Sequence, residues 1–205
     1  MKKVLIICAV FVLSALLISQ AAFAQKGLKF GMMGSIITGD NLDRVETKNG
    51  IVAGYFTHKA FSPTFGMTTE LLYSQYGYSQ LQTDDNGEDY RGIISLNYLE
   101  LPVLFKLIFG PEKKFRPNIY AGPSVMYFIH GKVEVEGEDG SLDIKGEWMN
   151  SLNYGIAFGG GVEISSFFFD FRFYVGLSKI GKSDQTAVAP DVKHSAYSVS
   201  TGIIF

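Results

Sequence analysis

The chain has 205 residues, with 18 lysines and arginines against 20 aspartates and glutamates. This near-neutral balance argues against a nucleic-acid partner, which selects a basic face, and a hydrophobic content of 47% excludes a disordered chain. The 23 glycines, 17 phenylalanines and 11 tyrosines favour an all-β fold, and the length suits one domain.

The N-terminus has the pattern of a secretory signal peptide. Two lysines precede an apolar stretch at residues 4–21, and Ala22-Phe23-Ala24 matches the small-residue pattern of a cleavage site. An uncleaved membrane anchor is the alternative, and the cleavage pattern disfavours it. We therefore expect cleavage between Ala24 and Gln25, with 1–24 as signal peptide and 25–205 as one domain without cysteine.

Alternating apolar and polar residues predict eight β-strands after the cleavage site. The clearest is 167–178, where every odd position from Phe167 to Leu177 is apolar and the even positions include Asp170, Arg172 and Ser178. The strands are expected at 27–38, 50–59, 64–79, 91–108, 115–130, 149–164, 167–178 and 194–205.

The connections between these strands alternate between long and short. Long connections are expected at 39–49, 80–90, 131–148 and 179–193, and short ones at 60–63, 109–114 and 165–166. Long loops at one end and tight turns at the other are typical of an outer-membrane β-barrel. We predict an eight-stranded antiparallel up-and-down transmembrane β-barrel, with turns and termini periplasmic and long loops extracellular. A soluble lipocalin-like barrel, which would turn the apolar faces inward, is the alternative.

The Ser165-Ser166 turn makes this prediction specific. A two-residue turn pairs Ile164 with Phe167 and Gly161 with Asp170. Each pair then shares a face, in agreement with the alternation of the two strands.

Charged residues within the strands fall on the polar, inward face. A side-chain-filled lumen with salt bridges is the favoured interpretation, and a gated ion path or small-ligand site is the alternative. These lumen charges are Glu70, Glu100, Lys106, Arg116, Glu163, Asp170 and Arg172.

Most remaining acidic residues fall in the long connections. The connection 131–148 carries six acids and ends in Trp148. It could bind divalent cations that bridge lipopolysaccharide, or a cationic partner; a soluble, repulsive surface is the favoured interpretation.

No catalytic, cofactor or metal site is expected. His194 and Ser195 are adjacent, so they face opposite sides of a strand. The acidic run 84–89 lacks the ligand spacing of a calcium loop, and the glycines at 159–161 precede no helix, unlike a phosphate loop.

The last strand alternates up to a C-terminal phenylalanine, a pattern similar to the signal read by outer-membrane assembly machinery. Its residues are Tyr197, Val199, Thr201, Ile203 and Phe205.

The segments Tyr98-Leu-Glu-Leu-Pro-Val-Leu-Phe-Lys106, Pro117-Asn-Ile-Tyr-Ala-Gly-Pro123 and Gly159-Gly-Gly-Val-Glu-Ile164 resemble the porin-family outer-membrane β-barrel domain of the PorT-like group. The resemblance covers the whole chain after the signal peptide. It implies an eight-stranded barrel in a Gram-negative outer membrane and no catalytic residues.

The expected function is a non-enzymatic envelope or interaction role, with outer-membrane lipid, lipopolysaccharide, the assembly machinery and an envelope protein as partners. A narrow channel or small-solute binder is one alternative. An outer-membrane lipid-modifying enzyme, which needs a His, a Ser and a carboxylate on one face, is the other.

Overall fold

The structure is a computed structural model that describes residues 24–38, 45–83, 89–110, 115–136, 140–144, 148–181 and 192–205. The predicted signal peptide, apart from Ala24, lies outside the described residues. So do parts of the long connections and most of the turn at 109–114. Within the described residues there is no helix long and apolar enough to cross a membrane.

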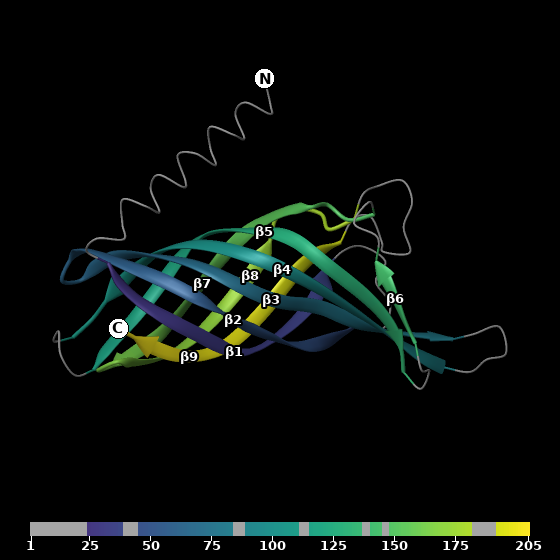
Figure 1. The fold of residues 1–205 in the computed structure, drawn as a ribbon, viewed down its shortest axis with the longest axis horizontal. Helices are drawn as coiled ribbons and strands as arrows, with labels where there is room; N and C mark the ends of the chain where they lie inside the picture. The colour runs from purple at the N-terminus through teal and green to yellow at the C-terminus, as the bar shows by residue number, and fades with distance from the viewer. Residues whose placement is uncertain are drawn as a thin grey trace, which may run out of the picture.

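Eight strands close into an antiparallel barrel (Figure 1). Each strand pairs with its neighbour in the chain, β4 pairs with β5, and β9 returns to pair with β1. The predicted all-β up-and-down barrel is therefore confirmed. The strands are β1 Gln25–Thr38, β2 Val45–Ser62, β3 Phe65–Thr83, β4 Asp89–Ile108, β5 Arg116–Val135, β7 Leu152–Ile164, β8 Phe167–Gly176 and β9 Lys193–Ile204.

The apolar faces of the strands point outward. Along β8, Phe167, Phe169, Phe171 and Phe173 are exposed, while the residues between them are buried. A soluble barrel would bury the apolar face instead, because apolar surface is driven out of water. The outward belt suits a bilayer, and the lipocalin-like alternative is wrong.

The predicted register around Ser165-Ser166 is confirmed. Ile164 pairs with Phe167 and Gly161 with Asp170. Ser165 has a φ of 55°, a left-handed conformation that reverses the chain within two residues. The turn thus sets which residues of β7 and β8 share the inward face.

Strands β2 to β5 are longer than predicted at the long-loop end, where β3 and β4 stay paired up to Thr83 and Asp89. Strands β7 and β8 are shorter there than the predicted 149–164 and 167–178, since β7 begins at Leu152 and β8 ends at Gly176. The predicted long connection 131–148 contains strand structure that the sequence analysis did not predict, because β5 runs to Val135 and pairs with a short strand, β6 (Ser141–Ile144). Beyond the bilayer both faces of a strand meet water, so the apolar alternation fades although the hydrogen-bonded pairing continues.

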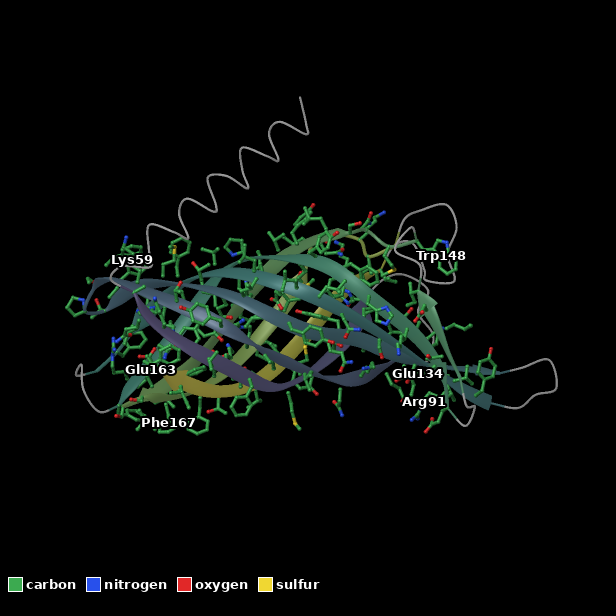
Figure 2. The ribbon with its side chains drawn as sticks, viewed as in Figure 1. Lys59, Arg91, Glu134, Trp148, Glu163 and Phe167 are labelled. Atoms are coloured by element: carbon green, nitrogen blue, oxygen red, sulfur yellow. The ribbon has the colours of Figure 1, made fainter. Side chains whose placement is uncertain are left out.

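The barrel has two unlike ends. The short-turn end carries the β2–β3, β4–β5 and β7–β8 connections, together with Gln25 and Phe205. Lys26, which follows Gln25, exchanges two backbone hydrogen bonds with Phe205. The long-loop end lies opposite and carries β6 (Figure 1). In Figure 2, Lys59, Glu163 and Phe167 mark the first end and Arg91, Glu134 and Trp148 the second.

Candidate functional site: the barrel lumen

The structure places all seven lumen charges of the sequence analysis inside the barrel, at three levels. Lys106, Arg116 and Glu163 lie near the short-turn end. Glu70, Asp170 and Arg172 lie at mid-height, and Glu100 lies above them toward the long-loop end. An eighth charge, Lys29, was missed. The signal that could have found it is alternation: Lys29 lies between Leu28 and Phe30, which point outward on β1 together with Met32.

At mid-height, four charges and one hydroxyl form the central ion cluster: Lys29, Glu70, Tyr120, Asp170 and Arg172. Arg172 donates two hydrogen bonds to Glu70, of 2.7 and 2.8 Å. Lys29 Nζ donates to Asp170 at 2.6 Å and lies 3.6 Å from Glu70. Tyr120 donates its hydroxyl proton to the other Asp170 oxygen.

The central ion cluster neutralises itself. Two cations face two carboxylates, and all four side chains are at least nine-tenths buried. Removing such charges from water costs several kcal/mol per ion, which only close pairing with good geometry offsets. The two-pronged contact between Arg172 and Glu70 supplies that geometry. The arrangement can therefore exist in a dry lumen without any bound ion.

Near the short-turn end, one carboxylate serves two cations in what we call the mouth cluster: Lys106, Arg116 and Glu163. Glu163 lies 3.2 Å from Lys106 Nζ and 3.5 Å from Arg116 Nη1. Both cations keep some solvent contact, with side chains 15% and 18% exposed. Among the residues described at this level, the mouth cluster carries one surplus positive charge.

Glu100 is bound by hydroxyl groups. Ser74 and Tyr76 donate to one carboxylate oxygen at 2.8 and 3.3 Å, and Ser124 donates to the other at 2.8 Å. No ion pair of Glu100 occurs in the described part of the chain, although the side chain is 3% exposed. Glu100 and Arg172 both line a cavity of about 20 Å³, which has room for a single water molecule.

Above Glu100, five rings form an aromatic layer across the lumen: Tyr76, Tyr98, Phe128, Tyr174 and His194. Tyr76 meets Tyr98 and Tyr174 edge-to-face, with centroids 5.6 and 5.7 Å apart. The Tyr98 hydroxyl and His194 Nε2 lie 2.9 Å apart. His194 therefore faces inward as part of the packing, separated from Ser195 on the other face of β9.

The long-loop end of the lumen is covered by apolar side chains from outside the barrel strands. Met149, Ile180 and Val192 are fully or almost fully buried. Backbone hydrogen bonds join their segments: Asn150, next to Met149, donates to Ile180 O, and Ile180 N donates to Val192 O. We call these three residues the long-loop cap. Nothing in the alternation of the sequence predicted it.

The acidic long-loop end contributes few defined contacts. Arg91 lies 3.2 Å from Glu46 and 3.6 Å from Glu136, and these side chains are all exposed. His130 and Asp143 of the β5–β6 hairpin lie 3.9 Å apart. Exposed pairs of this kind contribute little to stability, so this end presents charge to solvent.

Residues of the remaining predicted sites lie at the short-turn end or along β9. Ala24 precedes β1, and Gln25 begins it. Of the expected assembly signal, Tyr197, Val199, Ile203 and Phe205 are exposed on the outer face, and Thr201 is half-buried with its hydroxyl donating to Phe168 O.

The chain is similar to several solved structures. The attachment invasion locus protein Ail of Yersinia pestis, in a complex with a heparin analogue, is 14% identical over 89% of this chain and 99% of its own, with a TM-score of 0.46. Neisserial surface protein A is 11% identical over 88% and 97%, with a TM-score of 0.49. The outer membrane enzyme PagL is 14% identical over 86% and 98%, with a TM-score of 0.43.

No curated protein matches the sequence. The sequence profile of the outer membrane protein beta-barrel domain does match, over residues 19–181, and therefore covers most of the chain. Together with the closed ring of strands and the outward apolar belt, this match identifies the protein: it belongs to the outer membrane β-barrel domain family and is an outer-membrane protein.

Proposed function

We propose that this protein is a non-enzymatic barrel with a closed lumen that acts through its acidic long-loop end, in envelope integrity or in binding another envelope component. One observation carries the proposal: side chains fill the lumen at successive levels. The central ion cluster, the aromatic layer and the long-loop cap follow one another along the axis. Two internal cavities between the walls each have about 20 Å³ of room.

The orientation and partners are part of the same proposal. The short turns and both termini face the periplasm, as tight turns do in barrels of this class, and the long loops face outward. The acidic loops then meet lipopolysaccharide through divalent cations, or a cationic partner. The proposal also places the protein in a Gram-negative cell and assigns it to the PorT-like group. The assembly machinery then delivers it to the membrane by recognising the C-terminal residues.

The experiment is a paired measurement on protein purified from membranes in detergent. On a gel, the folded barrel should migrate differently before and after boiling, and the same sample should give no current steps in a planar bilayer. Discrete conductance steps from the folded band would overturn the closed lumen and favour the narrow-channel alternative. Protein that stays soluble without detergent would overturn the membrane placement.

The absence of an enzymatic activity is tested separately. Lipid A mass spectra of cells with and without the protein should be the same. Loss or gain of an acyl chain in the expressing cells would favour the lipid-modifying alternative and direct attention to His130 and Asp143, an exposed imidazole–carboxylate pair.

A further inference from the structure

The outward apolar belt contains a groove where its first and last strands meet. Figure 1 shows β9, β1 and β2 side by side, and residues of these strands and of β3 line the groove, which has a volume of about 520 Å³. Toward the short-turn end its lining is apolar and consists of Met32, Ile51 and Val199, all exposed. This part of the groove suits hydrocarbon.

Two local features of the sequence hollow out the wall here. The pairing of β2 with β3 is interrupted between Thr47 and Val52, where four residues of β2 lie opposite three of β3. Such a bulge bends its strand and interrupts the regular ladder. On β1, Gly34 brings no side chain to the outer face, and the end of the Tyr197 ring with its hydroxyl lies over it. The shape of the groove therefore comes from the backbone as well as from side chains.

The other end of the groove is polar. It is lined by Asn49 of β2, Gln75 of β3 and Tyr197 of β9. Asn49 and Tyr197 both pair with Gly34, which is two residues closer to the long-loop end than Met32. Within the described part of the chain, none of the three polar side chains makes a hydrogen bond. Polar groups that face a bilayer need a partner, because the hydrocarbon supplies none.

We propose that this groove, the belt groove, binds one acyl chain of lipopolysaccharide, with the polar linkage of that chain on Asn49, Gln75 and Tyr197. The belt groove is continuous with the surface that faces the bilayer, so its occupant comes from the membrane. Acyl chains of lipopolysaccharide carry hydroxyl and amide or ester groups next to the sugar, which donate and accept hydrogen bonds, as side-chain amides and a phenol do. The ester linkages of a phospholipid only accept. The choice of lipid rests on the proposed orientation, which puts this end of the belt in the outer leaflet.

Single polar groups of the belt groove can be removed without changing its shape. Tyr197→Phe keeps the ring over Gly34 and removes only the hydroxyl, so the affinity for lipid A should fall about fivefold, the usual effect of one hydrogen bond. Asn49→Leu removes an amide of similar size and should have a similar effect. Tyr154→Phe is the matched control, because Tyr154 is an exposed tyrosine on β7, outside the groove. It should leave the affinity unchanged.

The test is native mass spectrometry of the membrane-purified, delipidated protein in detergent, titrated with lipid A and, separately, with phosphatidylethanolamine. We expect one saturable lipid A molecule per chain and weaker binding of phosphatidylethanolamine. Equal binding of the two lipids would overturn the proposal, as would equal affinities of Tyr197→Phe and Tyr154→Phe for lipid A. A dimer that forms without lipid and excludes it would show that a second copy fills the groove. If Tyr197→Phe does not fold, Asn49→Leu decides by the same comparison.

A separate measurement tests the orientation on which the choice of lipid rests. Protease added to intact cells should cut the long connections. If it cuts them and the purified protein binds no lipid A, the belt groove is overturned and the orientation stands. Current steps in the planar bilayer concern the lumen and not the groove, so the two proposals fail separately.

Discussion

Arg172 and Glu70 face each other across the full width of the barrel, joined by two hydrogen bonds of 2.7 and 2.8 Å. They come from β8 and β3, which stand opposite each other in the ring of eight strands. The pair therefore ties together two walls that share no backbone hydrogen bond. We call this pair the brace, and its removal should lower the free energy of unfolding of the barrel.

Arg172→Ala should lower the free energy of unfolding by about 3–5 kcal/mol, because it leaves Glu70 buried without its main partner. Urea unfolding of the protein in detergent, followed by tryptophan fluorescence, measures this. The double variant Arg172→Met with Glu70→Met should recover much of the loss, since a well-packed apolar pair replaces a buried ion pair at little cost. An unchanged midpoint for Arg172→Ala would refute the brace.

Glu100 should behave differently from Glu70 although both are buried glutamates. Glu100→Gln removes a charge that no described cation compensates, and the three hydroxyls around it can rotate to suit an amide. The free energy of unfolding should stay within about 1 kcal/mol or increase. Glu70→Gln, the comparison, should lower it by about 3 kcal/mol. If Glu100→Gln and Glu70→Gln change the melting temperature equally, the different partners of the two glutamates do not explain their contributions to stability.

Gly202 lies where the barrel has no room for a side chain. A methyl group there would overlap the Leu28 carbonyl oxygen and the ring of Phe168, which packs edge-to-face on Phe56. Gly202→Ala should destabilise the barrel by about 1–3 kcal/mol, the usual range for overpacking. Gly140→Ala is the control, because nothing lies within 4 Å of that position. Equal melting temperatures for Gly202→Ala and Gly140→Ala would count against tight packing at Phe168.

The long-loop cap should not be the only barrier in the lumen. Met149→Ser with Ile180→Ser removes two of its apolar side chains but leaves the aromatic layer and the central ion cluster below. The variant should still give no current steps in a planar bilayer. Steps that appear only in this variant would show that the cap is a gate and that the inner layers let ions pass.

The proposed role of the C-terminus in assembly can be measured separately from its contribution to the stability of the folded barrel. Phe205 is 68% exposed, and its contacts to Lys26 run through the backbone, so Phe205→Ala should not change the melting temperature of folded protein. The amount reaching the outer membrane of living cells should fall severalfold. Phe167→Ala, an exposed phenylalanine at the same end, serves as control. Equal membrane yields for the three proteins would refute the assembly signal.

The alternation of the sequence predicted the outward and inward faces well, because a bilayer penalises polar groups on the outer face at every strand. The inward residues Glu70, Asp170 and Arg172 could be placed by that rule alone. Lys29 could have been placed by the same rule, since Leu28 and Phe30 on either side of it are exposed. The two-residue turn also predicted the β7–β8 register, since its length allows a single pairing.

The partners of the lumen charges could not be predicted. Local turns relate neighbouring strands only, whereas Arg172 and Glu70 meet across the barrel, and Tyr98 meets His194 from strands on opposite walls. Those contacts depend on the stagger accumulated around the whole ring. The long-loop cap was unpredictable for another reason: Met149, Ile180 and Val192 carry no periodic pattern, and only their packing over the lumen gives them a role.

The pairing of β1 with β9 has a consequence for how the protein is made. All other backbone pairings between barrel strands join strands that follow one another in the chain, and this one joins residues 27–38 to residues 193–204. Until the last strand pairs with the first, the sheet has two unpaired edges that invite pairing with other chains. A chain that ends early cannot finish the ring, so closure of the barrel depends on one event, the pairing of the first strand with the last.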